Sequence, residues 1–125
     1  MHKTAIVLLA DPKSGSDEAL GRLFNALAAA YDFKRQNMPV TLFFQGAGTR
    51  WPGELASREH PAHQLFAAVK DTVAGVSSGC ADVFGAHDGT AACGLDLIAE
   101  NAVPGTSGLP SLARLVSEGY SVLTF

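Results

Sequence analysis

Apolar runs and helical repeats alternate along the chain, and this alternation predicts the order of its elements. Residues 4–10 form a continuous apolar run, which is typical of a strand covered on both faces. Apolar residues then recur at helical spacing from Leu20 to Tyr31. We therefore expect an amphipathic helix that is capped by Ser14 or Ser16 and ends near Gln36.

The remaining segments continue this pattern. The sequence predicts further strands at residues 40–44, 73–77, 95–99 and 120–125. It predicts further helices at 63–72, 81–92 and 110–118, the last with Pro110 at a favourable first position. Residues 45–61 are rich in Gly, Pro and charge and predict a long loop or a short helix. Alternation of this kind indicates βαβ units, and hence an α/β fold with a parallel sheet and helices on both faces.

Size and charge narrow the functional classes. A chain of 125 residues predicts a single domain, residues 1–125, with a core of its own. Only 17% of the residues are charged, so we expect part of the surface to be covered by another copy. The net charge of −3 argues against nucleic acid and against an anionic membrane surface. The apolar start is too short for a signal peptide or a membrane span, which predicts a cytoplasmic protein with reduced cysteines.

Cys80 is the candidate nucleophile. It lies where the predicted strand 73–77 runs into a helix, and amides at a helix N-terminus favour a thiolate over a thiol. Small neighbours leave the sulfur approachable. The alternative is that Cys80 is an inert, buried small residue.

Other residues at the same sheet edge are candidates for binding an anion. In a parallel sheet, the loops that follow the strands meet at one edge, which brings Lys13 and Arg50 towards Cys80. The backbone amides of Gly79, Ala81 and Asp82 complete this candidate anion site. The Asp82 carboxylate opposes an anion by charge repulsion, although it favours the helix start.

Several other kinds of chemistry fit the sequence poorly. No arginine follows Cys80 closely, which argues against phosphatase or rhodanese loops. His87 lies seven positions on, about 10 Å along a regular helix and too far to act as a base. The spacing of His60, His63 and Cys80 matches no common zinc site, so no metal is expected.

Two further residues carry expectations of their own. Cys93 falls at the far end of the predicted helix 81–92, which excludes a disulfide with Cys80 and predicts a structural thiol. Trp51 lies in the long loop, where it lines a pocket or, as we prefer, packs against a neighbouring subunit.

Three segments of the chain resemble the DsrE/DsrF-like family of small sulfur-relay proteins. These are the first strand and helix, the turn at residues 79–86, and the closing helix and strand at residues 109–125. The resemblance implies a three-layer α/β/α domain, with a five-stranded mainly parallel sheet, assembled as dimers, trimers or hexamers. It also implies a cysteine after the third strand that accepts sulfane sulfur as a persulfide, a role that maps onto Cys80. Many relatives carry another cysteine just upstream, where this chain has Ser77 and Ser78.

Two functions follow from these expectations. The first is a cytoplasmic sulfurtransferase or sulfur carrier, in which the Cys80 thiolate takes sulfur from a donor protein and passes it to an acceptor. It requires no organic cofactor and no metal. The second is a non-catalytic oligomeric module that binds a small ligand or partner at the carboxyl edge of the sheet, with Cys80 incidental.

Overall fold

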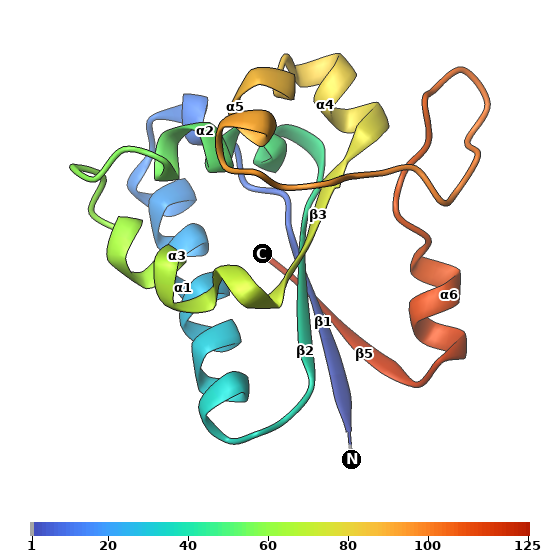
Figure 1. Ribbon diagram of the computed structural model, residues 1–125, viewed down its shortest axis with the longest axis horizontal. Coiled ribbons are helices and arrows are strands. Elements are labelled where there is room, and N and C mark those ends of the chain that lie inside the picture. Colours follow the sequence, from blue (N-terminus) through green and yellow to red (C-terminus); the bar gives the residue numbers. More distant parts are fainter. Residues whose placement is uncertain (1) are drawn as a thin grey trace.

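A five-stranded, all-parallel sheet organises the chain, and the predicted α/β/α architecture is confirmed (Figure 1). The computed structural model describes residues 2–125. Its strands, in the order β4-β3-β2-β1-β5 across the sheet, are β1 (Lys3–Leu8), β2 (Val40–Phe44), β3 (Val73–Ser77), β4 (Leu97–Ile98) and β5 (Tyr120–Thr124). The α-helices are α1 (Asp17–Arg35), α2 (Trp51–Leu55), α3 (His63–Val69), α4 (Ser78–Phe84), α5 (His87–Ala92) and α6 (Leu112–Ser117).

Strand β1 is an interior strand of the sheet, because it pairs with β2 on one side and with β5 on the other. Ala5 to Leu8 are all buried, which explains why this strand is an unbroken apolar run. The chain steps from β1 to β4 in one direction across the sheet and then returns to place β5 on the far side of β1. Since parallel crossovers are right-handed, the return connection places its helix on the opposite face.

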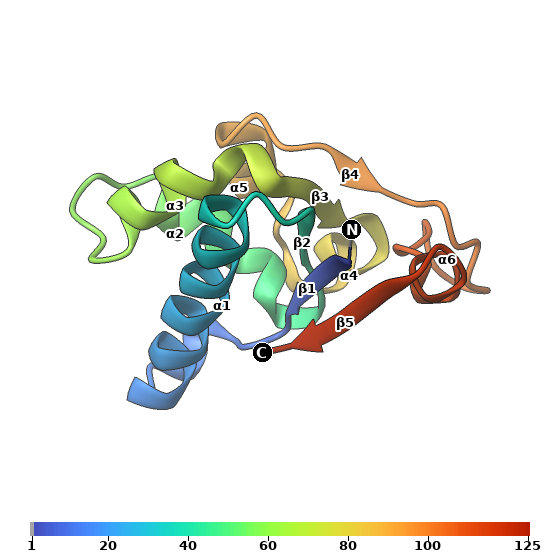
Figure 2. The same ribbon diagram turned by 90° about the horizontal axis from the view of Figure 1, so that it is seen from below.

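The helices divide between the two faces as this rule requires. Helices α1 and α3 pack on one face, over the larger core that contains Leu23, Leu27 and Phe66. Helix α6 packs on the other face, where Leu115 meets Ala5 and Phe43. Figure 2 shows α1 and α3 on one side of the strands and α6 on the other. Helices α2, α4 and α5 gather instead above the carboxyl ends of the strands (Figure 1).

Helix starts follow local capping. Ser16, not Ser14, caps α1, because its side chain accepts a hydrogen bond from the Ala19 amide. Ser111 caps α6 in the same way, so the predicted helical position of Pro110 is wrong and α6 begins at Leu112. The predicted strand 95–99 shortens to the two residues of β4, at an edge of the sheet.

The predicted helix 81–92 is two helices. Gly85 adopts a left-handed conformation (φ 66°) that ends α4, and the Ala86 amide donates to the carbonyl oxygen of Ala81 at 2.9 Å. Helix α5 starts anew at His87. The prediction that Cys93 and His87 share one continuous helix with Cys80 is therefore wrong, since the chain turns between Cys80 and both residues.

The close approach of β1 to the segment after β2 depends on Gly48. This residue lies in the short 3-10 helix η2 (Gly46–Arg50), and a Cβ atom there would overlap the backbone carbonyl oxygen of Leu8. The contact is with the backbone of Leu8, which cannot rotate away as a flexible side chain could, so only glycine fits at position 48.

We expect Gly48→Ala to lower the free energy of unfolding by about 2–3 kcal/mol, because the added methyl group forces η2 away from β1. Urea denaturation measures the change. Gly21→Ala is the matched control, since a Cβ at Gly21, within α1, meets no atom within 4 Å. It should raise the stability by up to about 1 kcal/mol. Equal stabilities for the two variants would contradict this account.

Candidate functional site

Cys80 lies in the first turn of α4, directly after β3. The strand ends at Ser77 and the helix begins at Ser78, so no loop separates them. Ser77 caps the helix, and its hydroxyl accepts a hydrogen bond from the Cys80 amide at 3.4 Å. The Cys80 side chain is partly exposed and its thiol is free. The junction therefore holds one accessible thiol in a defined position relative to the sheet.

The amides around Cys80 are already engaged in hydrogen bonds. The Gly79 amide donates to the carbonyl oxygen of Gly108 at 2.7 Å, and the Cys80 amide donates to Ser77. Ala81 is fully buried on the core side of α4. Gly79 is tightly covered, because a Cβ there would lie 2.9 Å from a methyl group of Leu109 and 3.1 Å from the carbonyl oxygen of Gly108. The segment that contains Gly108 and Leu109 thus covers the first turn of α4.

Asp82 links this covering segment to α4 and α5. Its carboxylate accepts a hydrogen bond from the Ser107 hydroxyl at 2.6 Å and also contacts Nε2 of His87. The Ser107 hydroxyl is in turn 2.7 Å from that of Ser78. The hydrogen bond from Ser107, followed by that of His87, lowers the pKa of Asp82. Asp82, for which the sequence predicts charge repulsion, thus also holds the segment around Ser107 against α4.

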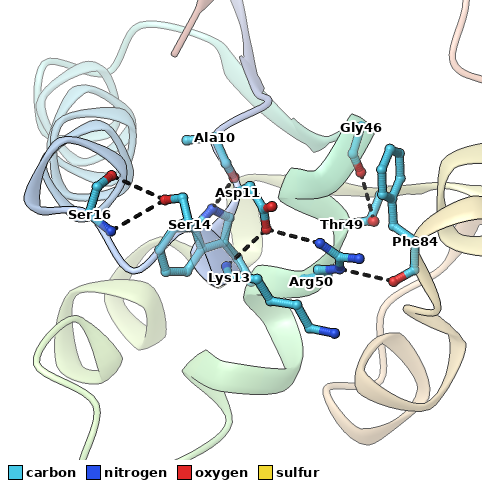
Figure 3. Close-up of polar contacts among 10 residues, drawn as sticks. Ala10, Asp11, Lys13, Ser14, Ser16, Gly46, Thr49, Arg50 and Phe84 are labelled. Atoms are coloured by element: carbon cyan, nitrogen blue, oxygen red, sulfur yellow. Dashed lines mark hydrogen bonds and ion pairs between the residues drawn. The ribbon is translucent and has the colours of Figure 1, made fainter.

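Arg50 joins three segments at the carboxyl edge of the sheet. Its Nη1 donates to the Asp11 carboxylate at 3.1 Å, and its Nε donates to the carbonyl oxygen of Phe84 at 3.0 Å (Figure 3). The guanidinium carbon lies 5.3 Å from the centre of the Phe84 ring. Phe84 is the last residue of α4, so Arg50 satisfies a free carbonyl group at the helix end, where a cation is favoured.

Lys13 reaches the same region from the loop after β1. Its backbone amide donates to the Asp11 carboxylate at 2.9 Å, and this bond, followed by the hydrogen bond from Arg50, lowers the pKa of Asp11. The side chains of Lys13 and Arg50 line one cavity with Phe84, whereas Cys80 is not among the residues that line it. The structure therefore brings Lys13 and Arg50 together, beside the end of α4 opposite to the one that carries Cys80.

The remaining residues singled out in the sequence have local roles. Trp51 is 2% exposed, and its Nε1 donates to the carbonyl oxygen of Ala10 at 2.7 Å, so it packs inside its own chain and the preferred packing against a neighbouring subunit is wrong. The ring nitrogens of His60 and His63 contact nearby backbone groups. Within residues 2–125, no three His, Cys, Asp or Glu side chains are grouped as metal ligands.

Cys93 differs from Cys80 in its surroundings. It is buried, and its thiol donates to the carbonyl oxygen of Pro52 at 2.9 Å. Burial raises the pKa of the Cys93 thiol, because the apolar surroundings disfavour the thiolate. Neither cysteine forms a disulfide bond. Cys80 is partly exposed to solvent, whereas Cys93 is buried.

The chain matches the model of the DsrE/DsrF-like family over residues 2–125. It belongs to this family. No curated protein and no solved structure matches it. Membership of the DsrE/DsrF-like family suggests a function in sulfur relay. In this family member, none of the helices within residues 2–125 has the length and apolar character needed to cross a membrane.

We expect Arg50→Lys to lower the free energy of unfolding by about 1–3 kcal/mol, because a single ammonium nitrogen does not reproduce the two separate donors, Nη1 and Nε, that bond Asp11 and Phe84. Urea denaturation tests this expectation. Arg22→Lys is the control, since within residues 2–125 Arg22 pairs only with Glu18, on the exposed face of α1. That change should stay within about 0.5 kcal/mol. A loss at Arg50 as small as that at Arg22 would refute the anchoring role.

We expect the Asp82 carboxyl to titrate below its ordinary value of 3.8, and Ser107→Ala to raise its pKa towards that value. The folded pKa lies below the unfolded one, so the contribution of Asp82 to stability is present above the unfolded value. It is lost as the pH falls through the folded value. Carbon NMR of the carboxyl group during an acid titration measures both effects. Ser117→Ala, in α6, is the control, and an unchanged Asp82 titration in Ser107→Ala would contradict the assignment.

Proposed function

We propose that this protein is a sulfur carrier that holds sulfane sulfur as a persulfide on Cys80. The observation that carries the proposal is the contrast between its two thiols. Cys80 is partly exposed at a strand-to-helix junction, whereas Cys93 is buried and bonded to a backbone carbonyl. Membership of the DsrE/DsrF-like family supports the sulfur chemistry. These observations favour Cys80 over Cys93 as the carrier.

The reaction needs no external oxidant or reductant. The Cys80 thiolate attacks the outer sulfur of a donor persulfide, the sulfur–sulfur bond of the donor breaks, and the donor leaves as a thiolate. Cys80 then carries the new sulfur–sulfur bond. An acceptor thiolate repeats the same exchange in the second half of the cycle and releases the Cys80 thiolate. Each step conserves the oxidation state of the transferred sulfur, as in thiol–disulfide exchange.

The surroundings of Cys80 support exchange with a partner protein. Val83, three residues further along α4, is 72% exposed, which is high for a large apolar side chain. Beside the first turn of α4, the hydroxyls of buried Ser78 and exposed Ser107 form a hydrogen bond of 2.7 Å. A donor or acceptor that docks on α4 would cover Val83 and bring its own sulfur towards Cys80. We place this exchange in the cytoplasm, where thiols stay reduced.

Self-association stays a prediction. Trp51 no longer supports it, because that side chain is buried within one chain. The low share of charged residues and the exposed apolar side chains of Val83 and Val116 support it still.

We expect the wild-type protein, treated with glutathione persulfide, to gain the mass of one sulfur atom that a reductant then removes. Cys80→Ser should gain none, because its hydroxyl does not form a stable persulfide. Cys93→Ser should load like the wild type, because Cys93 is buried. Intact-protein mass spectrometry measures the loading, and circular dichroism confirms that each variant is folded.

Two results would refute the carrier function. One is the absence of any labile sulfur on the folded wild-type protein at donor concentrations that load a small thiol. The other is equal loading of Cys80→Ser and the wild type, which would place the sulfur on Cys93.

A further inference from the structure

A cavity of about 230 Å³ lies at the carboxyl edge of the sheet, apart from the Cys80 thiol. We call it the Lys13–Arg50 cavity. Lys13 comes from the connection after β1 and Arg50 from the connection after β2, while Phe84 and Gly89 come from the connection after β3. Three successive strand ends thus contribute to one concave surface. The carboxyl edge of a parallel sheet is where ligands of α/β domains bind.

Two cationic side chains present nitrogen donors to this cavity. Arg50 uses Nη1 and Nε within the protein, and its Nη2 has no hydrogen-bond partner among residues 2–125. The Lys13 ammonium group also has none within that range, since only the backbone of Lys13 is bonded. In Figure 3 the Lys13 side chain extends away from Asp11 and runs below Arg50 in the view. Unused N–H donors on charged groups favour an acceptor that is itself charged.

The carboxylates near the cavity do not accept hydrogen bonds from these unused donors of Lys13 and Arg50. Asp11 is already bonded to Arg50 and to the Lys13 backbone, so it holds the two segments together. Glu54 lines the cavity but forms no ion pair with any group in residues 2–125, so it lies beyond 4.0 Å from both cations. The cavity thus keeps two unused cationic donors, with one carboxylate at a distance from them.

The other walls leave space for a small organic group. Phe84 lines the cavity, and its ring lies against the Arg50 guanidinium. Gly53 and Gly89 form another wall, where α2 and α5 approach so closely that a Cβ at Gly89 would lie 2.8 Å from the Gly53 Cα. The volume is below the range of about 300–1,000 Å³ that holds drug-sized ligands. The size therefore suits a small metabolite.

We propose that the Lys13–Arg50 cavity binds a small oxyanion, a carboxylate or a phosphate. The oxygens of the ligand accept hydrogen bonds from Nζ of Lys13 and Nη2 of Arg50. The rest of the ligand lies against Phe84 and the two glycines. This site does not depend on the thiol chemistry of Cys80, and it supplies a defined ligand class for the carboxyl edge of the sheet.

The test is an NMR titration of the full chain, labelled with ¹⁵N, with inorganic phosphate and separately with succinate. Chloride holds the ionic strength constant. We expect at least one of the two probes to give saturable shifts of the Gly53, Gly85 and Gly89 amides, which line the cavity. The probe that saturates at the lower concentration identifies the oxyanion class.

Charge variants give responses of opposite sign. Lys13→Gln should weaken binding by about three- to tenfold, because it removes a charged donor while its exposed position spares the fold. Glu54→Gln should tighten binding by about two- to threefold, because Glu54 is the only carboxylate among residues 2–125 that lines the cavity without an ion pair. Lys70→Gln is the matched control, since Lys70 is exposed and lines a different cavity. It should leave binding unchanged.

The proposal is overturned if neither probe gives saturable shifts of these glycine amides, or if Lys13→Gln binds as well as Lys70→Gln. It is also overturned if Glu54→Gln weakens binding, because the cavity then recognises a cationic or zwitterionic ligand. Cys80→Ser should bind the probe like the wild type. The oxyanion site and the sulfur carrier can therefore fail independently of each other.

Discussion

Parallel pairing of β1 with β2 and of β2 with β3 is the constraint on which the candidate sites depend. It sends the chain out of the sheet at one edge after every strand, so residues far apart in the sequence meet there. Asp11 and Arg50 form an ion pair across 39 positions of sequence for this reason. The pairing also requires close backbone contact, and Gly48 permits it beside Leu8. A shift in register between β1 and β2 would separate Asp11 from Arg50 and release the end of α4.

The sequence predicts the elements that rest on local signals. The strands at 40–44 and 73–77 agree with β2 and β3 because each is a short apolar run between polar turns. The sequence also places Cys80 at a strand-to-helix junction, where the structure has it. The break at Gly85 carried a signal as well, since a glycine within a helical stretch often marks a left-handed cap. The alanines around it obscured that signal, because they favour a continuous helix.

Other features depend on tertiary contacts that no local pattern reports. Trp51 lies in a polar, glycine-rich segment, which favours an exposed position, yet the Ala10 carbonyl and the core beneath it bury the ring. Similarly, nothing near Ser107 in the sequence indicates that its hydroxyl meets Asp82, 25 positions earlier. Arg50 was predicted to support an anion, but its contacts with Asp11 and Phe84 show that much of its hydrogen-bonding capacity serves the fold.

The two ends of α4 are held by different contacts and lie beside different candidate sites. Its first turn carries Cys80 and is held by the Ser77 cap and by the segment around Gly108. Its last residue, Phe84, is held by Arg50 beside the cavity. A helix of only two turns, anchored at both ends, cannot tilt without breaking one set of these bonds. The same short helix thus fixes both the turn that carries the thiol and one side of the cavity.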